Sequence, residues 1–85
     1  MNYSTFNQMP ALFQLGELSK QGVFLGYRIV GIYLVSLYQA HNFYVETFYH
    51  IEKHRIDEVI SFENTDLLIP YLKKIKIDLD AHCRL

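Results

Sequence analysis

The chain has 85 residues, of which 51% are hydrophobic and 20% charged, with a formal net charge of −1. This length predicts one small domain over residues 1–85, and the apolar content excludes an intrinsically disordered chain. Eight basic residues against nine acidic ones argue against an autonomous nucleic-acid-binding protein, which needs a basic excess to neutralise phosphates. The single cysteine, Cys83, cannot form an internal disulfide, which indicates a reducing, cytoplasmic environment.

The first eight residues are uncharged and lack the basic segment that opens a secretory signal, and we expect residues 1–8 to be flexible. Residues 9–20 predict a short helix. Met9, Leu12, Phe13 and Gly16 fall on one stripe at helical spacing. Pro10 suits its first turn, where the missing N–H costs nothing.

The next segment raises the question of a membrane span. Arg28 is the only formal charge between residues 21 and 45, and Gly22 and Gly26 have the spacing of a transmembrane dimer contact. The uncharged apolar run is shorter than the roughly 20 residues that a bilayer requires. It is also rich in Val, Ile and Tyr, which favour a buried strand. We therefore expect no membrane association, and a membrane-associated protein using residues 22–38 stays an alternative.

Three β-rich runs follow at residues 30–38, 43–51 and 56–63. The polar breaks between them, 39–42 and 52–55, are short, which predicts antiparallel hairpins. Glycines at 22, 26 and 31 fit turns or strand irregularities better than helix.

After Glu63 the apolar period becomes helical, because Leu67, Leu68, Tyr71, Leu72 and Ile75 recur on one helical face. Asn64 or Thr65 can cap this helix. Pro70 comes late, so the first turn is expected to be distorted or the regular helix to begin nearer Pro70. Residues 75–79 alternate as in an edge strand, and 81–85 are expected to fray. The predicted fold is α+β: a three- to four-stranded antiparallel meander flanked by an N-terminal and a C-terminal helix.

The strand pattern predicts two apolar faces of the sheet. Pairing Tyr38 with Phe43 and Ile51 with Ile56 puts Val45 and Thr47 on a first face. The expected buried core is Leu34, Val45, Ile56, Ile60, Phe62, Leu68 and Leu72. The opposite, second face carries Tyr33, Val35, Leu37, Tyr44, Glu46, Phe48 and His50. Since one C-terminal helix covers one face, the second needs the N-terminal helix, a curled sheet or a second copy of the protein.

Catalytic and metal-binding motifs are weak in this chain. His50 and His54 are four apart, but the intervening Glu52 is misplaced for a zinc-protease motif and the segment is a hairpin turn. No serine has nucleophile-elbow glycines, and no phosphate-binding glycine pattern occurs. The register places His50 opposite Asp57 as a surface or interface pair, and Glu58 opposite Tyr49 as a buried hydrogen-bonded pair. We therefore expect no metal and no cofactor, and the sequence favours a protein that acts by contact over an enzyme.

The segments Phe43-Tyr44-Val45-Glu46-Thr47-Phe48-Tyr49 and Leu68-Ile69-Pro70-Tyr71-Leu72, together with Ile56 and Phe62 between them, carry a resemblance. Over about residues 30–79 the pattern resembles a family of short uncharacterised bacterial α+β proteins with a similar hairpin and closing helix. The chain departs from that pattern at Thr47, where a β-branched hydrophobic residue is usual. The resemblance implies a fold and no activity.

The sequence predicts a small cytoplasmic interaction protein that forms a homodimer through the seven residues of the second face. The alternative is a small-molecule-binding or enzymatic module with a pocket lined by Tyr, Phe, His and Glu, formed within one chain or across a dimer. A competing explanation for the covered second face is an intramolecular lid, in which the helix at 9–20 packs Leu12 and Phe13 on Tyr33.

Overall fold

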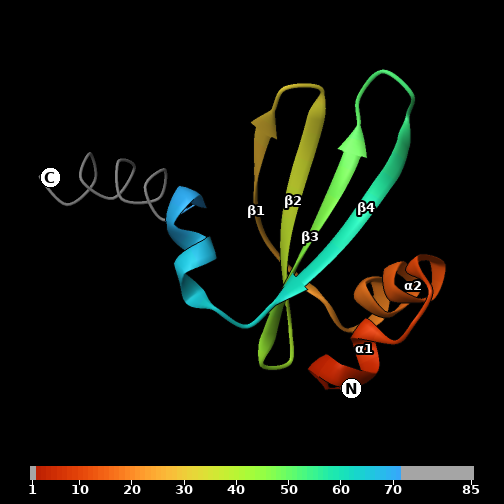
Figure 1. The fold of residues 1–85 in the computed structure, drawn as a ribbon, viewed down its shortest axis with the longest axis vertical. Coiled ribbons are helices and arrows are strands. Elements are labelled where there is room, and N and C mark those ends of the chain that lie inside the picture. Colours follow the sequence, from red (N-terminus) through yellow and green to blue (C-terminus); the bar gives the residue numbers. More distant parts are fainter. Residues whose placement is uncertain (1, 72–85) are drawn as a thin grey trace, which may run out of the picture.

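Four antiparallel strands form one sheet in the order β1-β2-β3-β4 (Figure 1). The strands are β1 (Val23–Val30), β2 (Tyr33–Ala40), β3 (Phe43–His50) and β4 (Arg55–Phe62). Helices α1 (Tyr3–Asn7) and α2 (Ala11–Gln21) precede the sheet, and a 3-10 turn, η1 (Thr65–Leu68), follows it. The computed structural model describes residues 2–71. It confirms the predicted α+β fold with an antiparallel meander.

Three of the expected elements are confirmed closely, and one strand was missed. α2, β3 and β4 lie within two residues of their predicted bounds. The predicted strand at 30–38 was wrong, because it crosses the turn at residues 31–32 that joins β1 to β2. β1 is the fourth strand of the sheet. Its Gly26 marks a bulge against β2, and that glycine disguised the strand in the sequence. The segment 75–79, the expected alternative, lies outside the described residues.

Two hairpins close through two-residue turns. Val30 pairs with Tyr33, and Ala40 pairs with Phe43. The first turn residue has a positive φ in both, +60° at Gly31 and +58° at His41, as in a type II′ turn, which favours glycine there. The break between these two strands was predicted at residues 39–42 and is shorter by two residues, so Phe43 pairs with Ala40 and not with Tyr38. A shift of two keeps each side chain on its expected face of β2 and β3.

The predicted register between β3 and β4 was wrong. A bulge at Phe48/Tyr49 makes Ile56 pair with Tyr49 and Glu58 pair with Phe48. Ile60 consequently lies opposite Glu46, on the second face. A slip of one residue moves a side chain to the other face of the sheet. Glu58 is therefore exposed instead of buried beside Tyr49.

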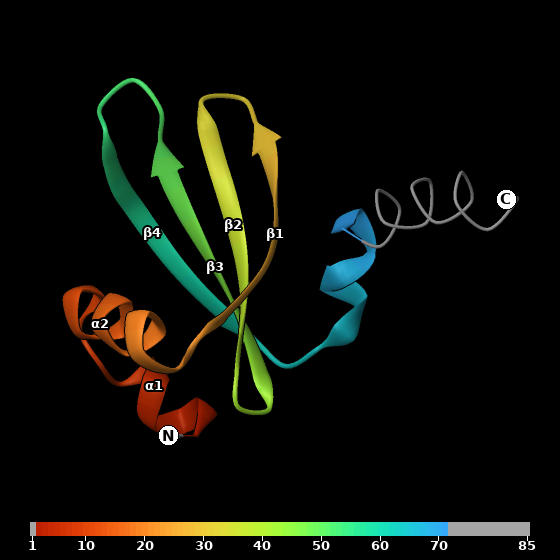
Figure 2. The same cartoon turned by 180° about the vertical axis from the view of Figure 1, so that it is seen from behind.

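The first face of the sheet is covered by α1 and α2 (Figures 1 and 2). Phe6 is fully buried, and its ring centroid lies 5.3 Å from that of Phe43. Side-chain amide Nε2 of Gln14 in α2 donates to the carbonyl of Phe6 at 2.9 Å, and the Ser61 hydroxyl of β4 donates to Asn7 Oδ1. The buried cluster comprises Phe6, Leu18, Ala40, Phe43 and Val45.

Two expectations concern the N-terminal part. Flexibility was expected over residues 1–8, and the structure contains α1 there, with the Asn2 side chain accepting from the Thr5 amide at 2.8 Å. The alternative prediction, that Leu12 and Phe13 form a lid over the second face, was wrong. α2 lies on the first face, and these two side chains are 77% and 63% exposed.

The chain after β4 crosses to the second face of the sheet, on the side of β1 (Figure 1). Asn64 caps η1, since its side chain accepts from the Asp66 amide at 2.8 Å. Residues 69–71 then turn α-helical, as the position of Pro70 predicts. Leu37, Phe62 and Tyr71 form the buried cluster on this face, with Tyr44 and Leu68 packed against it.

The predicted core is confirmed in part. Val45 and Phe62 are buried, and Leu34 and Leu68 are half-buried. The prediction that Ile56 and Ile60 are buried was wrong. Their side chains are 40% and 37% exposed, because the bulged β4 is an edge strand. Leu72 lies outside the described residues.

Residues 22–38, the candidate membrane segment, form β1 and most of β2. None of the helices within residues 2–71 has the length and apolar character that a membrane crossing requires.

We predict that Phe6→Ala lowers the free energy of unfolding by about 3–5 kcal/mol, because it removes a fully buried ring from the main core. The matched change Phe13→Ala, at an exposed ring of α2, is expected to alter stability by less than about 0.5 kcal/mol. Chemical denaturation measures both. Equal effects of the two changes would contradict the packing of α1.

We predict that His41→Gly raises the free energy of unfolding by about 0.5–1 kcal/mol, because glycine relieves the cost of a positive φ. Asn42→Gly, at the neighbouring turn residue with a negative φ, is expected to lower it. Thermal melts measure the stability of the two variants. A destabilised His41→Gly would contradict the prediction, because it would mean that contacts of the imidazole outweigh the cost of the positive φ.

Candidate interaction surface

The seven residues that the sequence assigned to an interface share the second face of the sheet. Tyr33, Val35 and Leu37 come from β2, and they pair with His50, Phe48 and Glu46 of β3. The seventh, Tyr44, lies on the same face at the far end of β3, opposite Phe62 of β4. Sequence periodicity alone therefore identified a true spatial cluster.

The exposure of this face differs from the expectation. Val35 and Leu37 are buried within the single chain, at 0% and 2% exposed, as are Glu46 and His50. The remaining three, Tyr33, Tyr44 and Phe48, are half-buried. A second copy of the protein is therefore not needed to cover the centre of this face. Part of the cover is supplied by Leu68 and Tyr71 of the same chain.

Tyr71 is anchored by a buried charged group. Its hydroxyl donates to Glu46 Oε2 at 2.6 Å, and Arg28 Nη2 approaches the same oxygen at 3.2 Å. The Arg28 guanidinium lies over the Tyr71 ring, 5.5 Å from its centroid. The ring lies beside Gly26 of β1, where an added Cβ would be 4.0 Å from it, in ordinary van der Waals contact. The three side chains Arg28, Glu46 and Tyr71 thus join β1, β3 and the C-terminal segment, and we call them the Tyr71 anchor.

The environment of the anchor favours the neutral phenol. Burial and the hydrogen bond to Glu46 raise the pKa of Tyr71 from 10.0 to about 12. Arg28 Nε is buried and has no hydrogen-bond partner within residues 2–71. The three side chains of the anchor thus bind one another and hold the C-terminal segment against the sheet.

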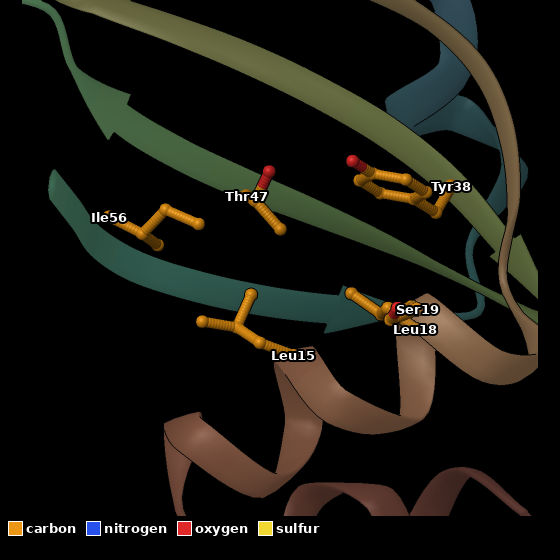
Figure 3. Close-up of a pocket in the computed structure, with 6 residues that line it drawn as sticks. All are labelled: Leu15, Leu18, Ser19, Tyr38, Thr47 and Ile56. Atoms are coloured by element: carbon orange, nitrogen blue, oxygen red, sulfur yellow. The ribbon is translucent and has the colours of Figure 1, made fainter. Parts of the chain in front are cut away.

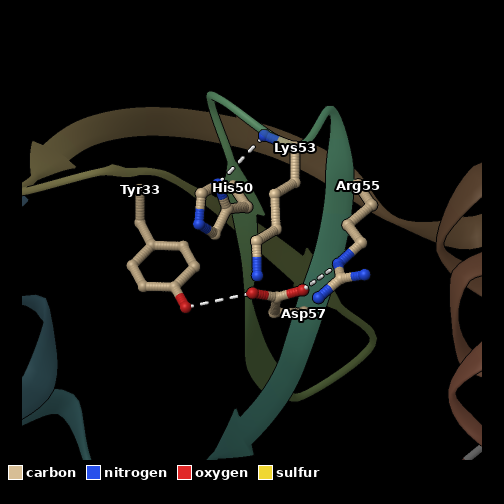
Figure 4. Close-up of polar contacts among 5 residues, drawn as sticks. All are labelled: Tyr33, His50, Lys53, Arg55 and Asp57. Atoms are coloured by element: carbon tan, nitrogen blue, oxygen red, sulfur yellow. Dashed lines mark hydrogen bonds and ion pairs between the residues drawn. The ribbon is translucent and has the colours of Figure 1, made fainter.

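A second polar cluster lies at the other end of this face, beside the β3–β4 turn (Figure 4). The Tyr33 hydroxyl donates to Asp57 Oδ2 at 3.0 Å, and Arg55 Nε donates to Asp57 Oδ1 at 2.8 Å. The Arg55 hydrogen bond, followed by that of Tyr33, lowers the pKa of the Asp57 carboxyl, and Asp57 in turn raises the pKa of Tyr33. Both carboxylate oxygens are therefore engaged.

The predicted His50–Asp57 pair was wrong. His50 lies opposite Arg55, and its Nδ1 accepts from the Lys53 amide at 3.1 Å. The Tyr33 ring meets the His50 ring edge-on, with 5.4 Å between centroids. His54 contacts the Tyr49 hydroxyl through Nδ1 at 3.2 Å. Within residues 2–71, no three His, Cys, Asp or Glu side chains lie close enough together to hold a metal.

The first face contains a groove that the sequence did not predict (Figure 3). It has a volume of about 240 Å³ and lies between α2 and the strands. Its lining consists of Leu15, Leu18, Ser19, Tyr38, Thr47 and Ile56. None of the seven second-face residues contributes, so this groove differs from the expected pocket of Tyr, Phe, His and Glu.

The second feature that the sequence did not predict is β1. It is an edge strand with exposed apolar side chains. The side chains of Val23, Phe24, Leu25, Ile29 and Val30 are between 42% and 59% exposed. Its one charge, Arg28, is already engaged by Glu46. Natural edge strands are usually protected by charges, prolines or a covering element. β4, the other edge, has such protection in Arg55, Asp57, Glu58 and its bulge, and α1 and α2 contact it.

Comparison with protein-family models, with curated proteins and with solved structures found no match to this chain.

One of the two missed features, β1, had a partial signal in the sequence. The run Val23-Phe24-Leu25 before Gly26 is β-prone, and reading the glycine as a bulge would have recovered β1. The groove had no such signal, because it depends on where α2 crosses the sheet.

We predict that the stabilisation from the Tyr71 anchor is lost at high pH. The pKa of Tyr71 is raised from 10.0 to about 12 by folding, so its contribution is complete below pH 10 and disappears as the pH rises through 12. After allowance for solvent screening, the expected loss is about 1–2 kcal/mol.

Denaturation at several pH values in wild type and in Tyr71→Phe measures this loss, because the variant cannot ionise at residue 71. Tyr44→Phe, which removes a half-buried phenol on the same face, is the matched control and is expected to follow wild type. A parallel pH dependence in all three proteins would contradict the assignment.

Proposed function

We propose that this chain is a small cytoplasmic interaction protein that forms a homodimer by pairing the β1 strands of two copies. The observation that supports the proposal is β1 itself, an apolar edge strand that pairs with no strand other than β2 within residues 2–71. An antiparallel β1–β1 pair would join two four-stranded sheets into one continuous sheet. The predicted self-association is thus retained, with its surface moved from the second face to the edge.

Charge and geometry favour a second copy as the occupant of this edge. The regular part of β1, residues 26–30, contains one charge, and Arg28 is paired with Glu46 in its own chain. Two copies therefore meet without net repulsion, and each offers apolar side chains to the other. A twofold axis lets the same patch serve both partners.

The hairpin geometry also indicates which backbone groups would pair. Val30 and Tyr33 flank a two-residue turn, a position at which the two residues exchange both backbone hydrogen bonds. Antiparallel pairs alternate, so the amide of Ile29 is expected to point away from β2, toward the open edge.

We predict that wild type is dimeric at micromolar concentrations and that Ile29→Lys is a folded monomer. The Ile29 side chain is 59% exposed, so lysine disturbs the edge and not the core. Leu12→Lys, the same change at an exposed leucine of α2, is the matched control and should stay dimeric. Analytical ultracentrifugation gives the masses, and circular dichroism confirms the fold.

Hydrogen exchange at the Ile29 amide distinguishes the possible occupants of the edge. Protection that increases with protein concentration supports pairing between copies. A monomeric wild type contradicts the proposal, and a protected Ile29 amide would then mean that the chain's own residues cover β1. A dimer that survives Ile29→Lys but dissociates on Phe48→Lys would return the interface to the second face.

A further inference from the structure

The alternation of β1 limits how two copies of this strand can pair. In an antiparallel sheet the backbone groups of successive residues point alternately to either side of the strand. Val30 pairs with Tyr33 beside a two-residue turn, so the N–H and C=O groups of Val30 are expected to point toward β2. Those of Tyr27 and Ile29 are then expected to point toward the open edge. A register shift precedes residues 26–30, which form the regular part of the strand.

The twofold axis of such a dimer can pass beside Tyr27, Arg28 or Ile29. With the axis at Arg28, Tyr27 of each copy faces Ile29 of the other, so both outward-pointing residues join hydrogen-bonded pairs. With the axis at Tyr27, Ile29 would have to pair with Leu25, which the register shift leaves without a partner in β2. With the axis at Ile29, Tyr27 would meet Gly31 in the turn. Backbone pairing therefore favours the axis at Arg28.

Side-chain chemistry favours the same axis. Tyr27 and Ile29 lie on the first face, since they pair with Ser36 and Leu34 of β2, and their side chains are 47% and 59% exposed. Pairs of an aromatic and a β-branched residue across antiparallel strands are stabilising. The register with the axis at Arg28 forms this pair on both sides of the axis and covers both side chains.

The charge of Arg28 is directed away from this axis. Arg28 Nη2 lies 3.2 Å from Glu46 Oε2. Glu46 belongs to β3, and β2 lies between β1 and β3. The Arg28 side chain thus reaches inward across β2, and its guanidinium lies over the Tyr71 ring. Two copies of Arg28 at the axis would therefore meet through their aliphatic parts, and each charge is neutralised within its own chain.

We propose that the homodimer is centred on Arg28, so that Tyr27 of each copy packs against Ile29 of the partner subunit. This assignment rests on the proposed function, because it specifies the register of the β1–β1 pair. The Tyr27 and Ile29 side chains of both copies then form one apolar patch across the axis on the first face.

The test mixes two full-length variants, Tyr27→Glu and Ile29→Lys, each of which is expected to be monomeric and folded. In the proposed register a heterodimer brings the new glutamate opposite the new lysine on one side of the axis. It keeps the native Tyr27–Ile29 pair on the other side. Opposite charges across antiparallel strands attract, so the Kd of the mixture is expected to be lower than that of either variant alone by about fivefold or more. Analytical ultracentrifugation measures this difference.

Matched mixtures separate the three possible axes. Tyr27→Lys mixed with Ile29→Lys brings like charges together and is expected to stay monomeric. Ile29→Glu mixed with Ile29→Lys gains an ion pair only if the axis passes beside Ile29. Tyr27→Glu mixed with Tyr27→Lys gains one only if the axis passes beside Tyr27. Dimers in either of the last two mixtures, without dimers of Tyr27→Glu with Ile29→Lys, would overturn the proposed register.

A measurement on wild type does not depend on the folding of any variant. In a dimer of one isotope-labelled and one unlabelled copy, isotope-filtered NMR spectra are expected to show contacts between the Tyr27 ring of one copy and the Ile29 methyl groups of the other. Contacts between the two Tyr27 rings alone, or between the two Ile29 side chains alone, would overturn the register and leave the dimer standing. A monomeric wild type would overturn the proposed function, and this assignment with it.

Discussion

The whole structure depends on a sheet that is apolar on both faces and so must be covered twice by a short chain. β2 and β3 bury side chains on alternate sides, with Val35 on one face and Val45 on the other, both at 0% exposed. The chain meets this requirement by sending its two ends to opposite faces. The N-terminal helices cover the first face and the segment at 65–71 reaches the second (Figure 2).

The Tyr71 anchor holds the C-terminal segment on the second face. Arg28 and Glu46 project from the sheet into an apolar surface. The same two residues on the exposed side of a helix would be ordinary surface charges. Removing charges from water is costly unless each finds a partner. The phenol of Tyr71 meets both of them, so its docking satisfies polar groups and buries an aromatic ring in one step. An apolar residue at position 71 could bury its side chain there but could not satisfy the polar groups.

The sequence predicted those parts of the fold that depend on local periodicity and turn chemistry. The alternation in β2 and β3 sorted all seven second-face residues correctly, and Asn64 with Pro70 located the distorted start of the C-terminal turn. It could not predict the β3–β4 register, because the bulge at Phe48/Tyr49 inserts one residue without a glycine or proline to mark it. Nor could it predict which helix covers which face, since both candidate helices are amphipathic and the choice depends on contacts distant in sequence.

The two edges of the sheet differ, and this difference limits the assembly that the chain can form. A sheet with two open edges can add copies head to tail without end, which leads to fibres. Here β4 carries charges and a bulge and contacts both helices, so within residues 2–71 β1 is left as the edge able to pair. An interface that uses β1 twice is closed after two copies. It also leaves the groove under α2 accessible in each copy, because Leu15, Thr47 and Ile56 lie on α2, β3 and β4 and not on the pairing strand.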